Sequence, residues 1–318
     1  MVDYSFNEKQ ETSFFSRNKL VSISIIIACM LFLGIFIMEK SQSVINMVPM
    51  LRGEISFEDG FSITTTKNRY PILIKKDDPF IGSQLRFSGD VKSIFSETAI
   101  SLAQNDEIVV EIGAHFGYNV LNIAKKTKGL RKYYAFEPNC GVLSCLRKSV
   151  VLNDLDDIVV LRDVAISDEK KSFPIDDCLS VTKTPRGEYT KPRTIIVNSN
   201  TLDDELENEP LTSISMLLID IPGSEFSILK GAEKIIANSP DIKIIISFNN
   251  KASSEYFDIE NELKKMEQQG FIFYLVETLN NYTQVNIPDI LSKKEVVIIM
   301  TKNKLNFDSN LAEADTLL

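Results

Sequence analysis

Residues 107–139, EIVVEIGAHFGYNVLNIAKKTKGLRKYYAFEPN, read as a strand, a glycine turn, a helix and a second strand. Ile108, Val109, Val110 and Ile112 form a short apolar run, rich in β-branched residues, of the kind that a parallel strand buried on both faces requires. Residues 118–127 continue at helical spacing, and residues 133–136 form the next apolar run. This alternation predicts an α/β fold with a parallel sheet.

The turn between the first strand and the helix is suited to a small ligand. Gly113 and Gly117 bracket it, and the absence of β-carbons lets the backbone approach a bound molecule closely. Glu137 ends the second strand, at the edge where open α/β sheets bind ligands, and a carboxylate there can accept both hydroxyls of a ribose. The alternative is an ordinary core turn in which Glu111 and Glu137 face solvent.

The glycine pattern distinguishes two classes of nucleotide ligand. A dinucleotide is bound by G-x-G-x-x-G, which places the pyrophosphate at a helix N-terminus. Here Asn119 stands where the third glycine would be, and the turn contains no Lys or Arg. S-adenosylmethionine has no phosphate, and its sulfonium and ammonium groups suit the acids Glu111 and Glu137. The turn therefore favours S-adenosylmethionine, and a nicotinamide-binding oxidoreductase is the least favoured function.

The composition is that of a globular protein with an appendage. The chain has 318 residues, 44% hydrophobic and 25% charged, which suffices for one large domain. A net charge of −9 argues against a nucleic-acid backbone as partner. Cys29, Cys140, Cys145 and Cys178 lack the spacing of a zinc site and are too few for a disulfide framework. We therefore expect neither a metal nor a nucleic-acid partner.

The appendage is an apolar segment near the N-terminus. Residues 20–38, LVSISIIIACMLFLGIFIM, contain no charge. As a helix they would span roughly 28 Å, close to the thickness of a bilayer core. No small-residue cleavage site of the signal-peptide type follows the segment. The sequence therefore predicts a single uncleaved transmembrane anchor.

The charges around this segment predict its orientation. A small excess of basic residues before it favours a cytosolic N-terminus. These residues are Lys9, Arg17 and Lys19 before the segment, and Lys40 and Arg52 after it. We therefore expect a type II single-pass protein of the endoplasmic reticulum or Golgi, with a lumenal catalytic domain that requires imported cofactor. The sequon Asn281-Tyr282-Thr283 is compatible with that location.

The remaining chain divides into regions of different character. We expect a short tail over 1–19, a stem with a few short elements over 39–93, the α/β domain over 94–304 and a C-terminal tail over 305–318. Periodicity predicts helices over 94–103, 140–152, 226–237 and 256–269, and strands over 158–161, 215–221, 242–248, 271–276 and 296–300. The sheet should contain about seven strands, with the last pair antiparallel and helices on both faces. The polar stretch 170–197 interrupts this rhythm and suggests a hairpin or lid.

Four segments together resemble the FkbM-type methyltransferases. They are VVEIGAHFGYNVL, AFEPN followed by a helix, NTLDDEL and LLIDIPGSEFSILKGA, in the order and spacing of that family. The pattern ID-x-x-G-x-E-x-x-x-L-K-G-A in the last segment makes the combination specific, and the resemblance runs from about residue 105 to 277. The family is similar to class I S-adenosylmethionine-dependent methyltransferases, whose sheet is Rossmann-like. It mostly O-methylates hydroxyls or carboxyls of small molecules and sugars.

The resemblance implies a set of cofactor-binding residues in this sequence. They are Glu111, Gly113, Ala114, His115 and Gly117 at the methionine end, Glu137 at the ribose, Asn139 beside the ribose or adenine, and Asp163, Val164 and Ala165 beside the adenine ring. His115 is the only histidine and stands where the family usually has Asn. We expect it to make a loop contact rather than to act as a catalytic base.

The resemblance also implies two catalytic acids, Asp220 and Glu225. Asp220 ends the fourth strand beside the expected sulfonium methyl, whereas Glu225 starts the next helix, where the macrodipole alone favours a carboxylate. The expected enzyme is a membrane-anchored O-methyltransferase acting on a glycan, lipid or small molecule. Pro222 stands where the family commonly has an acid or amide, and the family often has an acid near the end of the fifth strand, where this chain has residues 247–250, Ser-Phe-Asn-Asn. A catalytically inactive binding or scaffold protein of the membrane is therefore the alternative.

Overall fold

The computed structural model describes residues 54–305, except residues 92, 104–106, 183, 185 and 280. They belong to a compact unit that begins at Glu54. The predicted membrane anchor over residues 20–38 lies outside the described residues. Within the described ranges, no helix is both long enough and apolar enough to cross a membrane.

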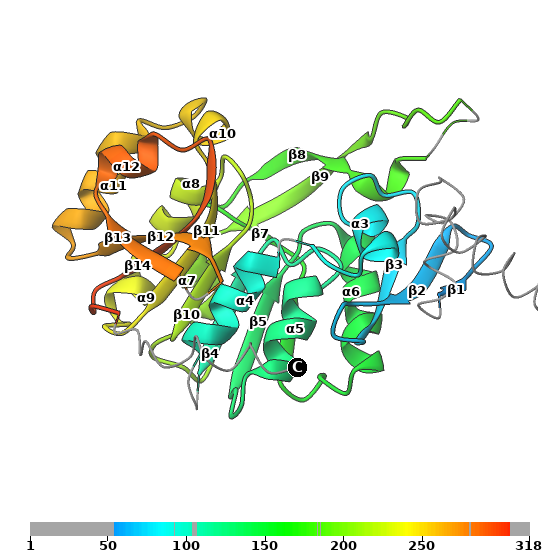
Figure 1. Cartoon of the computed structure of the whole chain (residues 1–318), viewed down its shortest axis with the longest axis horizontal. Coiled ribbons are helices and arrows are strands. Elements are labelled where there is room, and N and C mark those ends of the chain that lie inside the picture. The colour runs from blue at the N-terminus through cyan, green and yellow to red at the C-terminus, as the bar shows by residue number, and fades with distance from the viewer. Residues whose placement is uncertain are drawn as a thin grey trace, which may run out of the picture. The chain divides into compact units, whose positions relative to one another are not determined.

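A mixed sheet of eight strands forms the centre of the unit (Figure 1). In spatial order it contains β13 (Asn281–Val285), β12 (Ile272–Thr278), β14 (Glu295–Thr301), β11 (Lys243–Asn249), β10 (Met216–Ile219), β4 (Ile108–Ile112), β5 (Lys132–Phe136) and β6 (Val159–Arg162). The strands from β11 to β6 run parallel, and β14 pairs antiparallel with both β11 and β12. The sheet is therefore mixed, with a parallel part from β11 to β6 and an antiparallel part from β13 to β14.

The edge strand β13 was not predicted. It pairs antiparallel with β12, so the sheet has one strand more than the expected seven. Its sequence, NYTQV, is polar, and none of its residues is buried. An exposed edge strand needs no apolar run, because its position is determined mainly by backbone pairing with its neighbour.

Helices cover both faces of the sheet. One face carries α7 (Leu202–Leu206), α8 (Glu225–Lys230), α9 (Glu233–Ala237), α11 (Ile259–Gln268) and α12 (Ile287–Leu291). The other face carries α3 (Gly82–Phe87), α4 (Ser93–Leu102), α5 (Tyr118–Lys126) and α6 (Cys140–Leu152). In β4, Val110 joins the core on the first face and Val109 the core on the second. The apolar run of β4 is therefore buried on both faces, as its sequence predicted.

A small antiparallel sheet precedes the central one. It contains β1 (Ile55–Ser56), β2 (Phe61–Thr65) and β3 (Pro71–Lys75), and Figure 1 shows it beside α6. The backbone N–H of Leu73 donates to Ser149 Oγ of α6 at 3.0 Å. The short elements of the region 39–93 that the structure describes thus belong to the same compact unit as the α/β domain.

The polar stretch between Lys170 and Val197 forms a hairpin. Its strands β8 (Ser172–Asp177) and β9 (Arg193–Asn200) pair antiparallel, and β9 also pairs with the short strand β7 (Ala165–Ile166). A single 3₁₀ turn, η1 (Cys178–Ser180), follows β8. Figure 1 shows the hairpin extending beyond the central sheet.

The prediction of one helix over residues 226–237 was wrong. The structure has two helices, α8 and α9, with Gly231 and Ala232 between them. A β-carbon at Gly231 would lie 1.9 Å from the carbonyl oxygen of Ser167, so the backbone passes too close for a side chain. The apolar periodicity continues through this break, which is why the sequence did not reveal it. A further short helix, α10 (Asn250–Ser254), follows β11.

Candidate active site

The turn after β4 is fixed by its two glycines. Gly113 has a φ of +89° and Gly117 a φ of +93°, which are values that favour glycine. A β-carbon at Gly113 would lie 2.7 Å from Ile221 Cγ1, and one at Gly117 would lie 2.3 Å from Leu146 Cδ1. The N–H of Gly113 donates to the carbonyl of Phe136 at 3.0 Å, which ties the turn to β5. Both glycines are therefore required by the backbone conformation and by close packing.

Glu137 links the end of β5 to the same turn. Its Oε2 accepts from the His115 N–H at 3.0 Å, and its Oε1 accepts from the Asn139 N–H at 2.9 Å. Burial raises the pKa of Glu137 to about 7, and the charge of Asp163 adds to this rise. Each carboxylate oxygen has a second lone pair, so Glu137 keeps acceptors for the hydroxyls of a ribose.

Glu111 is fully buried on β4. Its Oε1 accepts from Asn119 Nδ2 at 2.9 Å, and its Oε2 accepts from the Tyr133 hydroxyl at 2.7 Å. Burial raises its pKa to about 7, with smaller contributions from the charges of Asp220 and Glu137. Both oxygens thus bind side chains of α5 and β5, and a contact between Glu111 and the cofactor stays a prediction.

Asn139 caps α6 and binds the hairpin. Its Oδ1 accepts from the backbone N–H groups of Gly141 and Val142 at 3.1 and 3.2 Å. Its Nδ2 donates to Asp177 Oδ1 at 3.1 Å, at the end of β8. The side chain thus has a clear structural role, because an N-cap of this kind satisfies otherwise unpaired donors of the helix.

The segment implied for the adenine ring lies at the same edge of the sheet. Asp163 follows β6 and is exposed, Val164 is half-buried, and Ala165 is buried in β7. Asp163 is close enough to Glu137 for its charge to raise the pKa of that carboxyl. The structure therefore brings this segment and the predicted ribose acid together.

Asp220 follows β10 and lies beside the glycine turn. Its N–H donates to the carbonyl of Ile112 at 3.3 Å. Asp220 lines a small cavity of about 20 Å³ together with Gly113, Ala114 and His115. The predicted catalytic acid and the predicted cofactor loop thus meet, although they lie about a hundred residues apart in the sequence.

Glu225 occupies a different environment. It is fully buried at the start of α8, and its Oε2 accepts from the Gly223 N–H at 2.8 Å and from Ser253 Oγ at 2.9 Å. Burial raises its pKa. Glu225 does not line the small cavity beside Asp220. These contacts agree with a carboxylate that holds the Gly223 turn and α10, and catalysis by Glu225 stays a prediction.

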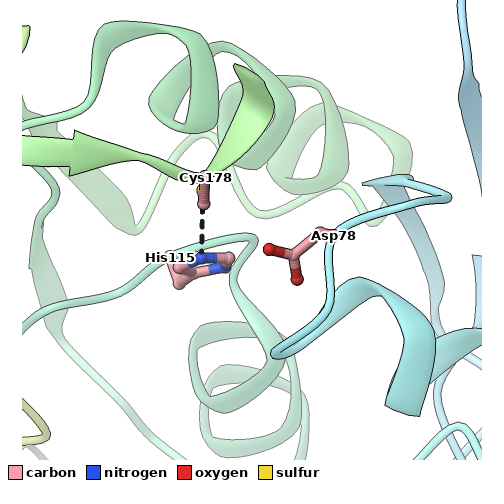
Figure 2. A group of neighbouring side chains, drawn as sticks. All are labelled: Asp78, His115 and Cys178. Atoms are coloured by element: carbon pink, nitrogen blue, oxygen red, sulfur yellow. Dashed lines mark hydrogen bonds between the residues drawn. The ribbon is translucent and has the colours of Figure 1, made fainter. Parts of the chain in front are cut away.

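Two residues outside the predicted site, Asp78 and Cys178, lie against His115 (Figure 2). Cys178 Sγ lies 3.6 Å from His115 Nε2, and the three side chains each offer a ligand atom within 4.8 Å of the others. Burial lowers the pKa of His115, although the charges of Asp78 and Asp220 oppose this effect. Sequence reasoning missed the cluster because its members come from three separate segments and match no spacing pattern.

A larger cavity of about 480 Å³ lies at the carboxyl end of β11. Its lining includes Phe95, Pro222, Ser247, Asn249 and Glu295. Most of the lining side chains are apolar. Pro222 and Ser247, two positions at which the sequence departs from the pattern of the FkbM-type enzymes, both line this cavity.

A family model described as the methyltransferase FkbM domain matches residues 111–273, just over half of the chain. No curated protein matches. The fold is similar to that of methyltransferase FkbM from Methylobacillus flagellatus KT, with a TM-score of 0.41, 15% identity, and coverage of 68% of this chain and 52% of that chain.

Two other solved structures are similar at comparable distances. P. horikoshii TYW2 in complex with MeSAdo gives a TM-score of 0.44 and 12% identity over 78% of this chain and 74% of that chain. Precorrin-6y C5,15-methyltransferase from Geobacter metallireducens GS-15 gives a TM-score of 0.40 and 13% identity over 77% of this chain and 97% of that chain. These similarities are distant, and the assignment to a family depends on the family model.

Proposed function

We propose that this chain, which belongs to the FkbM methyltransferase family, transfers a methyl group from S-adenosylmethionine to a hydroxyl or carboxyl oxygen. The observation that carries this proposal is the hydrogen bond from the His115 N–H to Glu137. It joins an acid suited to a ribose to a turn that two glycines with positive φ hold close to the end of β5. When bound, S-adenosylmethionine supplies a methyl group that its sulfonium has already activated.

Some residues of the chain would bind the cofactor, and others would align the acceptor oxygen with the methyl group. Gly113 and Gly117 would let the turn adopt its conformation beside the cofactor. Glu137 would hold the ribose, and Asp163 to Ala165 would border the adenine. Asp220 would orient the acceptor oxygen or take its proton. Alignment of two reactants contributes effective molarities on the order of 10⁵–10⁸ M, whereas a general base contributes about 10²–10⁴-fold. The enzyme therefore depends more on positioning than on a strong base.

The cavity at the end of β11 is the proposed acceptor site. Its residue Pro222 lies two positions after Asp220, and Ser247, Asn249 and Glu295 supply its polar groups. Such a lining, mainly apolar with a few polar groups, is typical of small-molecule sites. It favours an acceptor with an apolar part, such as a lipid or a small molecule, over an unmodified glycan.

Membrane anchoring is a further part of the proposal. Residues 20–38 would anchor the chain as a type II protein, with the enzyme in the lumen of the endoplasmic reticulum or Golgi. Protease treatment of sealed membranes tests this orientation. A catalytic domain that is digested without detergent would place the domain in the cytosol and contradict the lumenal location.

Binding of S-adenosylmethionine to the full chain, measured by calorimetry, tests the proposed function. We expect binding that Glu137→Ala abolishes and that Glu207→Ala, a change at an exposed acid, leaves intact. Incorporation of labelled methyl groups into fractionated lipids, glycans and small molecules then identifies the acceptor class. Absence of cofactor binding would contradict the proposal and favour a scaffold protein. Binding without methyl incorporation would favour an inactive binding protein.

A further inference from the structure

Asp78 is a fully buried residue whose carboxylate is only half satisfied by the described part of the chain. Its Oδ2 accepts from the N–H groups of Ile81 and Gly82 at 2.7 and 2.6 Å. Its Oδ1 is buried and has no hydrogen-bond partner among the described residues. A buried carboxylate oxygen without a partner is costly, so Oδ1 requires a donor or a cation that binds there.

The loop that carries Asp78 is built to hold it in place. The N–H and hydroxyl groups of Ser83 donate to the Asp78 carbonyl at 3.0 and 2.8 Å. A β-carbon at Gly82 would lie 2.2 Å from the Lys75 carbonyl, so only glycine fits this close turn. The position of the Asp78 carboxylate is therefore fixed by the packing of the loop.

The carboxylate of Asp78 lies close to the cofactor turn. Figure 2 shows Asp78 and Cys178 on different sides of the His115 ring, and their ligand atoms all lie within 4.8 Å of one another. His115 Nδ1 is also buried and without a hydrogen-bond partner among the described residues. Ile81, from the loop of Asp78, lines the same small cavity as Asp220. The loop of Asp78 and the turn of His115 thus bring a carboxylate and an imidazole together beside the small cavity.

The charges around this place favour a cation. Burial lowers the pKa of His115 and so disfavours a positive charge on its imidazole, whereas the charges of Asp78 and Asp220 raise that pKa. Within the described ranges, no lysine or arginine forms an ion pair with Asp78. The negative charge of Asp78 is therefore left without a cationic partner from the described part of the protein.

We infer that Asp78 Oδ1 binds the ammonium group of the methionine part of S-adenosylmethionine, and that His115 lies beside it. This inference rests on the proposed function. A divalent cation could also be held by Asp78, His115 and Cys178. The ammonium is favoured because His115 belongs to the turn whose glycines and Glu137 contact form the proposed cofactor cradle.

Three ligands separate the ammonium contact from the rest of the cofactor. S-adenosylmethionine and S-adenosylhomocysteine both carry the ammonium, whereas methylthioadenosine keeps the adenosine and the sulfur but lacks the amino-acid part. We expect Asp78→Asn to weaken binding of the first two ligands to the full chain by about 30-fold or more, because a buried charge partner is lost. Methylthioadenosine should bind this variant within about threefold of the wild type. Asp77→Asn, a change at the neighbouring acid, should affect none of the three.

The outcomes distinguish this inference from the proposed function. If the wild type binds S-adenosylmethionine and Asp78→Asn weakens all three ligands equally, or none of them, the ammonium contact is wrong. If the wild type binds none of the three ligands, the proposed function fails and this inference fails with it. If zinc alone binds tightly and Asp78→Asn removes only zinc binding, the site is a metal site and the inference is overturned.

A measurement on the wild type covers the case in which Asp78→Asn does not fold. An S-adenosylhomocysteine analogue that lacks the amino group should bind about 30-fold or more weakly than S-adenosylhomocysteine. Equal affinity of the two ligands would overturn the inference.

Discussion

The carboxylate of Glu137 accepts a hydrogen bond from the backbone N–H of His115 at 3.0 Å. His115 has a φ of +48°, so its backbone is in the left-handed region and its N–H points to the end of the neighbouring strand. One contact thereby joins two adjacent parallel strands at the edge where such sheets bind ligands. The proposed cofactor site is therefore held together before any ligand binds.

Gly117→Ala should destabilise the protein more than Gly270→Ala. Both glycines have positive φ, at +93° and +89°, so each substitution strains the backbone by about 1–2 kcal/mol. Only Gly117 adds a collision, with Leu146 Cδ1 at 2.3 Å, whereas nothing lies within 4 Å of a β-carbon at Gly270. The collision should add about 1–3 kcal/mol. Urea denaturation of the two variants measures the difference, and equal losses would show that Leu146 moves away without cost.

Asp203→Ala should reduce stability, whereas Asp204→Ala should not. Asp203 accepts from the N–H groups of Lys234 and Ile235 at 2.9 and 2.8 Å, and so satisfies the first donors of α9. Loss of such a cap costs about 0.5–2 kcal/mol. Asp204 is exposed and provides the matched control. Thermal denaturation should give a lower Tm for the Asp203 variant alone; the same Tm for both variants would contradict the capping role.

Asp220→Asn should reduce methyl transfer by about 10²-fold or more while cofactor affinity changes little. The reason is that Asp220 lies beside the glycine turn, where it would act on the acceptor oxygen rather than on the adenosine. Single-turnover methyl transfer and calorimetric Kd measure the two effects separately. Asp204→Asn is the control. Normal turnover in Asp220→Asn would show that the assignment of this acid is wrong.

Glu225→Ala should act mainly on stability. Its Oε2 accepts from the Gly223 N–H and from Ser253 Oγ, and the Gly223 N–H would lose its partner, whereas Ser253 Oγ also donates to the Asn249 carbonyl. An unsatisfied buried donor costs about 1–3 kcal/mol. Chemical denaturation should show this loss, with Glu207→Ala as the exposed control. Unchanged stability combined with lost turnover would instead support the catalytic role that the sequence implied.

The buried carboxyl of Glu111 should make stability fall as the pH rises. Its pKa is raised from 4.5 to about 7, so the folded protein binds a proton that the unfolded chain releases. This stabilising contribution is complete below pH 4.5 and is lost as the pH rises through 7. The difference corresponds to about 3 kcal/mol.

Glu111→Gln removes this titration and keeps the shape of the side chain. The free energy of unfolding of the variant, relative to the wild type, should therefore increase between pH 5 and pH 8. Urea denaturation at several pH values measures it. A constant difference across this range would show that Glu111 does not titrate there.

Much of the parallel half of the sheet could be predicted from the sequence, because short-range signals define it. The range of β4 agrees with its apolar run, and that of α6 agrees with its helical spacing. The edge strand β13 and the break between α8 and α9 could not be predicted. One depends on pairing with β12, and the other on the Ser167 carbonyl that approaches Gly231.

The sequence by itself determined the alternation of strands and helices, the two glycines of the cofactor turn and the acids at the strand ends. Each of these is a local pattern, read within a few turns or strands of chain. Only the tertiary structure decided which polar groups meet. It paired both oxygens of Glu111 with Asn119 and Tyr133, and it brought Asp78 and Cys178 to His115. The physical reason is that such contacts depend on burial and on packing between distant segments, which no spacing along the chain encodes.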